Sequence, residues 1–185
     1  EVRNNTIDGH SSYGLYWRSD DYSTDVLDAT NNSITNNGTG IYCYNGGDYN
    51  TIAYNNSWNN SSGNYENNLP TGTGNLTDIN ANGNVCDIYY NISENPLYID
   101  SDSDNFYIDS ESPNIDAGDP SLFDSDGTIS DIGKYPYQYD IVPSPSSIDF
   151  GLVTVGTDST ATLTLSANLT DIEVTDIVVS DNVFS

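Results

Sequence analysis

The feature that most constrains the fold is a short repeat, rich in asparagine, in the first half of the chain. Three segments align, with Asn4–Ile7 leading to Gly14-Leu15-Tyr16, Asn31–Ile34 to Gly40-Ile41-Tyr42, and Asn55–Trp58 to Gly63-Asn64-Tyr65. The repeats start 27 and then 24 residues apart. That length allows strands of about three to five residues, joined by corners where Asn and Gly take bent or left-handed backbone. Asn, Gly, Ser, Thr and Tyr are also mediocre or poor helix formers. The repeats therefore predict an all-β fold of stacked turns of chain, with stacked Asn side chains bonding to the next turn.

These segments resemble the Asn-Asn-x-Ile…Gly-Ile-Tyr coils of pectate-lyase-like right-handed parallel β-helix proteins. The resemblance covers roughly residues 2–135. It implies a parallel β-helix over residues 1–140, equivalent to the C-terminal coils of a surface protein of this group.

A stretch from Ser112 to Tyr135 separates two halves of different character. It contains Ser-Pro-Asn-Ile-Asp-Ala-Gly-Asp-Pro, then Asp-Ser-Asp-Gly, then Asp-Ile-Gly. The stretch resembles the segment that closes many β-helix domains of secreted microbial surface proteins. We call residues 112–135 the closing segment, and the resemblance implies that it is the cap and hinge of the molecule.

The closing segment gathers five carboxylates with only Lys134 nearby to neutralise them. Calcium binds six to eight oxygen ligands, and a segment with so many carboxylates needs a counter-charge. We therefore predict a calcium site with ligands drawn from Asp116, Asp119, Asp124, Asp126 and Asp131; the alternative is a solvated acidic turn.

A weaker metal site is predicted at Asp100, Asp102 and Asp104. With Glu111 at the twelfth position, this run formally resembles an EF-hand loop. Asn105 replaces the expected glycine, however, so a turn between two short strands is the better interpretation.

The chain after the closing segment has a different pattern. Residues 141–147, with Pro143-Ser144-Pro145, predict a short stiff linker. Apolar residues alternate with period two over 148–185, which predicts β-strands. This region resembles the first half of an Ig-like β-sandwich of the ASH or choice-of-anchor type, found on bacterial and archaeal surface proteins. A whole sandwich needs about seven strands and roughly 100 residues, so the sandwich is expected to be partial, with Ile172, Val174, Ile177, Val179 and Phe184 short of a partner sheet.

The charge balance excludes several functions. Lys and Arg total 3 against 28 acidic residues, for a formal net charge of -25. Such a chain has almost nothing to neutralise phosphates, so we expect no nucleic-acid partner and no binding to an anionic membrane surface. No apolar run approaches the roughly 18 residues of a membrane span.

Catalysis is poorly supported by the sequence. The basic side chains are Arg3, Arg18, Lys134 and the single His10, and no Ser-His-Asp or Cys-His arrangement can be built around His10. Enzymes of the pectate-lyase type need a basic residue as well as calcium. We therefore predict that this chain is not an enzyme.

Nine Asn-x-Ser/Thr sequons predict N-linked glycans, although such residues also suit corners. They are Asn4, Asn31, Asn37, Asn55, Asn59, Asn60, Asn75, Asn91 and Asn168. Because Asn4, Asn31 and Asn55 hold the same place in successive repeats, their glycans are expected to form a stripe.

The two cysteines, Cys43 and Cys86, leave their pairing open. They are 43 residues apart, near two coils. Equivalent positions two coils apart would be separated by about 9–10 Å, beyond the reach of a disulfide. Two free, buried thiols are therefore favoured unless a loop brings them together.

Two functions remain open from the sequence. The first is an extracellular, glycosylated, calcium-stabilised structural or adhesive protein of a microbial cell surface. The second is the C-terminal part of a secreted polysaccharide-active enzyme. Polysaccharide is a candidate partner because Tyr and Trp side chains stack on sugars, here Tyr13, Tyr16, Trp17, Tyr42, Tyr44 and Trp58; the alternative is that they fill a thin core. The open ends at Glu1 and Ser185 predict either a longer surface protein or head-to-tail assembly with copies of itself into a filament or sheath.

Overall fold

The computed structural model describes residues 1–20, 25–45, 47–137, 141–144, 148–149, 154, 156–157 and 159–167. The chain divides into two compact units, residues 1–137 and 138–185. The boundary expected from the sequence was residue 140. Each unit is described by itself.

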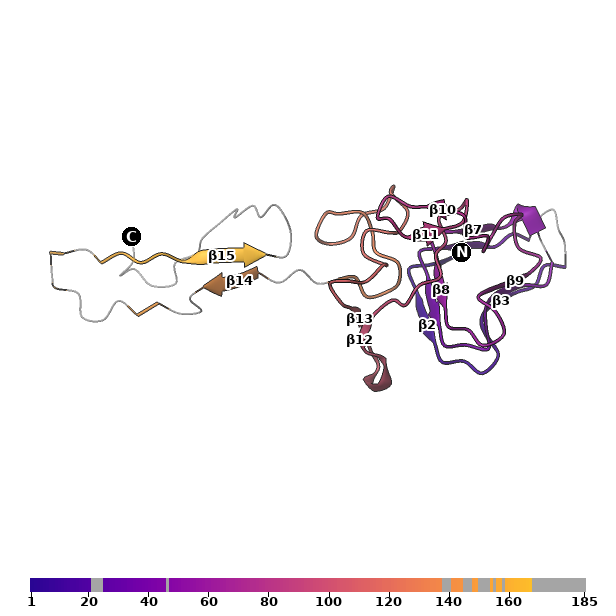
Figure 1. The fold of residues 1–185 in the computed structure, drawn as a ribbon, viewed down its shortest axis with the longest axis horizontal. Helices are drawn as coiled ribbons and strands as arrows, with labels where there is room; N and C mark the ends of the chain where they lie inside the picture. Colours follow the sequence, from indigo (N-terminus) through magenta and orange to yellow (C-terminus); the bar gives the residue numbers. More distant parts are fainter. Residues whose placement is uncertain are drawn as a thin grey trace. The chain divides into compact units, whose positions relative to one another are not determined.

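The first unit is built from three successive windings of chain, each contributing one short strand to each of three parallel sheets (Figure 1). The first winding holds β1 (Val2–Arg3), β2 (Thr6–Asp8) and β3 (Tyr13–Trp17). The second holds β4 (Asp28–Thr30), β5 (Ser33–Thr35) and β6 (Thr39–Cys43). After the 3-10 turn η1 (Gly47–Tyr49), the third holds β7 (Thr51–Ala53), β8 (Asn56–Trp58) and β9 (Tyr65–Asn67). The sheets are ordered β1-β4-β7, β2-β5-β8 and β3-β6-β9. An all-β fold of parallel sheets is thereby confirmed.

The register between windings differs from the predicted alignment at one point. Thr6 pairs with Ser33 as expected, but Ser33 pairs with Asn56 and not with Ser57. The prediction aligned the Asn-Asn pairs of the second and third repeats and was therefore wrong by one residue. The physical reason lies in the side-chain ladder described below.

The interior of the three windings holds a small aliphatic core. Its buried members are Leu27, Ala29, Ile34, Ile41, Cys43 and Ile52, and half-buried Val2, Ile7, Leu15, Trp17, Tyr65 and Leu69 pack against them. Strand residues alternate between this core and the outside. Ile34 therefore points inward from β5, while its neighbour Ser33 points outward.

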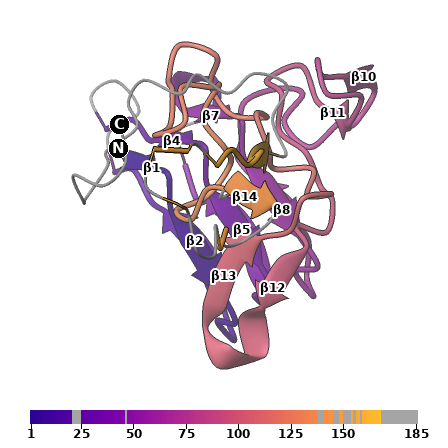
Figure 2. The same ribbon diagram turned by 90° about the vertical axis from the view of Figure 1, so that its left-hand side faces the viewer.

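Two antiparallel hairpins follow the windings. The first pairs β10 (Asp78–Ile79) with β11 (Val85–Cys86). The second pairs β12 (Tyr98–Asp100) with β13 (Asn105–Ile108) through the 3-10 turn η2 (Ser101–Ser103). This second hairpin lies against β2, β5 and β8 (Figure 2), and a 2.6 Å hydrogen bond joins the Tyr98 and Ser33 hydroxyls.

The closing segment covers the outer face of the β2-β5-β8 sheet. The Lys134 amide donates to Thr6 Oγ1 at 3.1 Å, and Asn114 Nδ2 donates to Ser33 Oγ at 3.2 Å. Asn56 Nδ2 in turn donates to Asn114 Oδ1 at 2.6 Å. Because Thr6, Ser33 and Asn56 are register partners, the segment crosses all three windings along their side. It therefore does not act as the end cap that the resemblance implied.

In the second unit, β14 (Ile141–Ser144) pairs antiparallel with β15 (Thr164–Ala167). The linker predicted at 141–147 therefore begins with a strand. Proline lacks a backbone N–H donor. It can still stand in an edge strand, where that N–H would face the open side of the sheet. The sequon Asn168 and the strands expected around Ile172, Val174, Ile177, Val179 and Phe184 lie outside the described residues.

Candidate functional site

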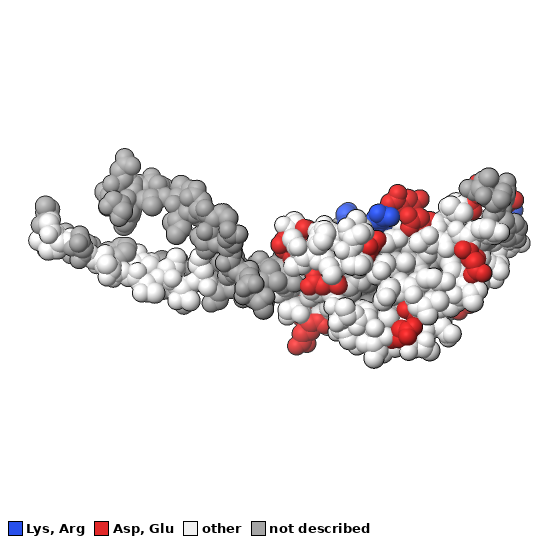
Figure 3. Space-filling model, turned by 90° about the horizontal axis from the view of Figure 1, so that it is seen from above, with Lys and Arg blue, Asp and Glu red and all other residues white. Residues whose placement is uncertain are grey.

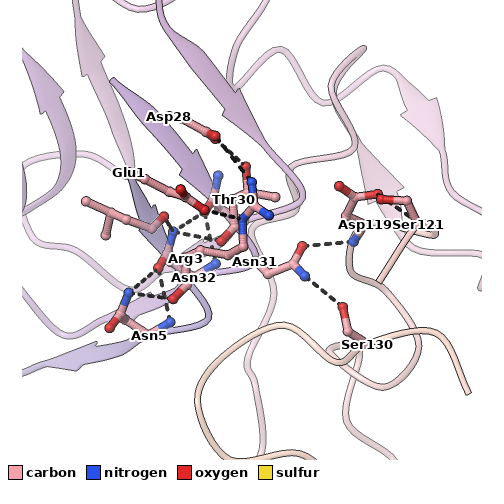
Figure 4. Close-up of polar contacts among 12 residues, drawn as sticks. Glu1, Arg3, Asn5, Asp28, Thr30, Asn31, Asn32, Asp119, Ser121 and Ser130 are labelled. Atoms are coloured by element: carbon pink, nitrogen blue, oxygen red, sulfur yellow. Dashed lines mark hydrogen bonds and ion pairs between the residues drawn. The ribbon is translucent and has the colours of Figure 1, made fainter. Parts of the chain in front are cut away.

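An inner ladder of asparagine side chains runs through the windings. Asn32 Oδ1 accepts from the backbone and side-chain nitrogens of Asn5, at 3.1 and 3.0 Å (Figure 4). Asn55 Oδ1 does the same for Asn32 at 3.0 and 2.9 Å, and Asn91 Oδ1 for Asn55 at 3.0 and 3.0 Å. Each side-chain amide thus forms hydrogen bonds with the corner of a neighbouring winding. This role requires a side chain with both a donor and an acceptor.

The inner ladder ends at a buried carboxylate. Asp87 Oδ1 accepts from the amide of Asn91 at 3.0 Å, and both Asp87 oxygens accept from Asn91 Nδ2. The amides of Gly74 and Tyr89 also donate to Asp87, at 2.7 and 2.8 Å. An acceptor-only side chain suits the end of a ladder, because every remaining group there is a donor. The sequence analysis did not single out Asp87.

A second ladder follows the next corner of each winding. Asn37 Oδ1 accepts from the His10 amide at 2.9 Å, Asn60 Oδ1 accepts from the Asn37 amide at 2.9 Å, and Asn64 Oδ1 accepts from the Asn60 amide at 3.1 Å. The residue before most ladder positions has a left-handed backbone, as at Asn31 (φ 57°) and Tyr54 (φ 54°). Asn31 and Tyr54 hold equivalent positions in the second and third windings, and so do Asn32 and Asn55.

These ladders decide which sequons face solvent. Asn31, Asn37, Asn55, Asn60 and Asn91 are buried, each at most 9 % exposed. The Asn55 and Asn91 Nδ2 atoms, to which a glycan would be attached, donate to Ala29 O and Ile52 O inside the fold. Asn31 is held between the Asp119 amide and Ser130 Oγ (Figure 4). The fold therefore has no space for glycans at these five positions, and a stripe through Asn4, Asn31 and Asn55 is excluded.

Of the eight sequons that the structure describes, three keep an exposed asparagine, namely Asn4, Asn59 and Asn75, and the prediction for Asn168 lies outside the described residues. They lie in a corner of the first winding, a corner of the third, and the loop before β10. The interpretation that these residues serve as corners is correct for most of the set, and N-glycosylation stays a prediction for these three.

Three of the five carboxylates predicted to bind calcium, Asp124, Asp126 and Asp131, lie near one another, and four of the five accept hydrogen bonds from backbone amides. Asp119 Oδ1 and Asp126 Oδ1 each accept from the amide two residues ahead, in Ser121 and Thr128. Asp131 uses both oxygens, for the amides of Asp116 at 2.8 Å and Tyr137 at 2.6 Å. Among the residues that the structure describes, no three His, Cys, Asp or Glu side chains are arranged to hold a metal ion. Calcium binding at the closing segment therefore stays a prediction.

Asp124 and Asp131 are instead carboxylates whose ionisation burial opposes. Desolvation raises the pKa of Asp131 to about 6. Desolvation, contact with Asp126 and the charge of Asp131 raise the pKa of Asp124 to about 7. Asp124 Oδ1 is buried and has no hydrogen-bond donor, so protonation lets it donate to Asp126. Desolvation of Asp126 is outweighed by hydrogen bonds from Asp124 and Thr128, which lower its pKa.

The weaker acidic run lies in the β12–β13 hairpin. Asp100, Asp102 and Asp104 are exposed, and Asp104 has a left-handed backbone (φ 59°) that closes the turn. A turn between two short strands was the better interpretation, and the structure confirms it.

A groove of about 670 Å³ lies between the windings and the second hairpin. Its floor comes from Thr35, Asn36, Trp58 and Asn59; its other wall comes from residues 95–99, Ser101, Asp109 and Glu111. The exposed amide of Asn59 donates to Asn36 Oδ1 at 2.8 Å, and Asn36 Nδ2 donates to Asp8 Oδ1 at 2.7 Å. We call this the Trp58 groove. Of the groove residues, only Trp58 was expected from the sequence to contact sugars, because the groove is assembled from separate segments of the chain.

A second aromatic surface lies on the outer face of β3 and β6. The Tyr16 and Tyr42 rings stack with centroids 5.7 Å apart, and Tyr13 packs 5.0 Å from Tyr42. Tyr44 lies beside them, with the Arg18 guanidinium 5.5 Å from its ring centroid. These rings are exposed or half-buried, whereas Trp17 packs against the core. We call the surface formed by these four tyrosines the tyrosine face; unlike Trp58, none of the four lines the groove.

The described basic side chains are engaged in local contacts. Arg3 pairs with Glu1 and Asp28, Arg18 with Asp20, and Lys134 lies 5.1 Å from the Tyr135 ring centroid. None of these side chains lines the Trp58 groove.

Both cysteines are free and buried, and they belong to two different core clusters. Desolvation raises the pKa of Cys43 to about 12. The Cys43 thiol therefore stays protonated and unreactive at neutral pH.

Comparison with protein-family models, with curated proteins and with solved structures gives no match. The described residues contain no helix with the length and apolar character that crossing a membrane requires.

Proposed function

We propose that this chain is a non-enzymatic, adhesive part of an extracellular surface protein, built as a parallel β-helix, that binds polysaccharide in the Trp58 groove. The single observation that supports this function most is the composition of the groove. It combines an aromatic ring, exposed amides and carboxylates in one polar depression of about 670 Å³, a volume within the usual range for ligand sites.

The groove chemistry favours sugars over apolar ligands. Trp58 offers a ring for stacking, and the side chains of Asn36, Asn59 and Asn95 offer donors and acceptors to hydroxyl groups. The carboxylates of Asp109 and Glu111 accept hydrogen bonds from the same kind of group. Hydroxyl-rich ligands match such a mixture of aromatic rings, from Trp58 and Tyr98, and short polar side chains.

The charge of the molecule favours a neutral polysaccharide. Acidic side chains form separate groups over the face seen in Figure 3, where Lys and Arg are sparse. With a net charge of -25 and no basic residue lining the groove, an anionic chain would be repelled. Pectate-like polymers are therefore poor candidates. A groove that repels anionic polymers is also poorly suited to an enzyme of the pectate-lyase type.

Glycans at Asn4 and Asn75 and a calcium ion at the closing segment are accessory parts of the proposal, whereas a glycan on Asn59 would fill the Trp58 groove. For calcium, Asp124 and Asp131 are the pair that an added cation would favour in the ionised form.

The experiment uses tryptophan fluorescence. The chain has 2 tryptophans, so Trp17→Phe leaves Trp58 as the only reporter. Titration with a soluble neutral β-glucan should change this emission saturably, and polygalacturonate should not. Trp58→Ala should abolish binding in an independent assay by affinity electrophoresis, while Tyr16→Ala on the tyrosine face should retain it.

An unaltered emission together with unretarded migration in the glucan gel would contradict polysaccharide binding at this groove. Release of reducing or unsaturated sugar ends during the titration would instead support the enzyme alternative.

A further inference from the structure

A second cavity, of about 240 Å³, lies where three separate segments of the first unit meet. Tyr54 and Tyr90 come from the corners that precede two ladder residues, and 80–82 come from the turn between β10 and β11. The closing segment supplies 116–118, Pro120 and Ile129. Cavities of about 150 Å³ accept a benzene-sized group. This cavity therefore suits a small organic group and is too small for a sugar chain.

The walls of the cavity are aromatic and aliphatic. The Tyr54 and Tyr90 rings stack with centroids 5.2 Å apart and an interplanar angle of 9°. Ala81, Ala117 and Ile129 contribute methyl and methylene groups. Tyrosine rings attract cations over their faces, and aliphatic walls favour a ligand that carries alkyl groups.

The polar part of the cavity is anionic. Asp116 Oδ1 is buried and has no hydrogen-bond donor. Desolvation and the charge of Asp119 raise the pKa of Tyr54, which shows that a second carboxylate lies near the ring. No Lys, Arg or His lines the cavity. The carboxylate of Asp116 therefore gives the cavity lining a negative charge that no basic residue of the lining offsets.

We propose that this cavity binds an alkylammonium group, with its charge at Asp116 and its alkyl part against Tyr54 and Tyr90. The ammonium would pair with the Asp116 carboxylate, which lines the cavity, and the rings would stabilise the cation further. Calcium fits this cavity poorly because it needs six to eight oxygen ligands, and most of the lining is apolar. The ammonium belongs either to a small free amine or to a lysine side chain of another protein.

The test follows the backbone amide signals of Ala81, Ala117 and Gly118 by NMR while probes are added to the whole chain. Tetramethylammonium and n-butylammonium should shift these signals saturably. The neutral isostere n-butanol should bind at least about tenfold more weakly, since it lacks the charge. Nα-acetyl-lysine N-methylamide separates the two sources: binding like n-butylammonium indicates a lysine side chain, and no binding indicates a free amine.

Two variants preserve the left-handed backbone at the sites that they change. Asp116 has φ 51° and Tyr90 has φ 63°, and asparagine tolerates this conformation, as it does at Asn31. Asp116→Asn should weaken n-butylammonium about tenfold, to the level of n-butanol, and Tyr90→Asn should weaken tetramethylammonium severalfold. Asp102→Asn, in the exposed hairpin turn, is the matched control and should change neither.

Three results would overturn the proposal. They are equal binding of n-butanol and n-butylammonium, unchanged ammonium binding by Asp116→Asn, and signals that shift with calcium chloride but with neither ammonium ion.

Discussion

At the scale of single residues, the corners of the windings follow one rule. A residue with left-handed backbone is followed by an asparagine whose amide bonds to the neighbouring winding. Stacked asparagines were predictable, since their amide both donates and accepts. The register of the third winding was not, because the left-handed position there is held by Tyr54, and large side chains rarely adopt that conformation. The predicted alignment matched the Asn-Asn pairs of the repeats. It therefore placed Asn55 opposite Asn31, one position before its true partner Asn32.

The inner ladder is expected to be essential for stability. Asn55→Ala removes the acceptor of Asn32 and the donor to Ala29 O and Ala53 O, all in buried surroundings. Buried groups that lose partners cost about 1–3 kcal/mol each. We expect a loss of about 3 kcal/mol and a fall in Tm on the order of 10 °C, measured by thermal unfolding.

Asn68→Ala is the matched control for this variant. Asn68 makes one side-chain hydrogen bond, to Tyr44 O, at an exposed site. The loss there should stay below about 1 kcal/mol. Equal melting temperatures for the two variants would show that the ladder has no special role.

Burial also predicts which sequons are occupied in a host that glycosylates. Asn4 and Asn75 are exposed, lie outside the Trp58 groove and should accept glycans once the chain has folded. The five buried sequons should stay bare, because their side chains bond inside the fold. Peptide mapping after enzymatic deglycosylation gives the occupied positions. A glycan on Asn55 or Asn91 in folded protein would contradict the ladder.

At the scale of elements, the windings were predictable and the segments packed on them were not. Short strands and corners follow from local chemistry in the repeats. The placement of the closing segment depends on contacts such as Asn31 Nδ2 to Ser130 Oγ, between residues 99 apart. Local sequence patterns do not reveal contacts between residues so far apart in the chain. The closing segment was therefore expected at an end of the windings, whereas it lies along their side. Its carboxylates were recognised, but their use as acceptors of backbone amides depends on the folded geometry.

Without divalent cations, the closing segment should lose stability as pH rises. Asp124 and Asp131 have pKa values of about 7 and 6 in the folded chain, above the ordinary value of 3.8. Between about pH 5 and 8 the unfolded chain binds fewer protons than the folded chain, so the free energy of unfolding falls with pH. After a discount for solvent reaching Asp124, the loss is on the order of 1 kcal/mol. Thermal unfolding in chelator at several pH values measures it.

Asp124→Asn should flatten this pH dependence, whereas Asp102→Asn should leave it intact. Calcium should raise Tm more at pH 8 than at pH 5, because it favours the ionised pair. An Asp124→Asn slope equal to wild type would refute the assignment, and a calcium effect of zero at pH 8 would remove calcium from the proposed function.

At the scale of the whole first unit, function depends on surfaces that several segments build together. The Trp58 groove needs corners of the second and third windings and a hairpin that begins more than thirty residues later. Sequence alone indicated the aromatic residue and the excess of acidic side chains. It gave no means of bringing Asn36, Trp58 and Asp109 to one place, because hairpin packing on the β2-β5-β8 sheet is set by tertiary contacts such as Tyr98 to Ser33.

Hydrogen–deuterium exchange with and without a neutral β-glucan tests the proposed function most directly. Binding in the Trp58 groove should protect amides around residues 35–36, 58–59 and 95–99 and leave those of the tyrosine face on β3 and β6 unchanged. Protection confined to the tyrosine face, or no protection at saturating glucan, would contradict it.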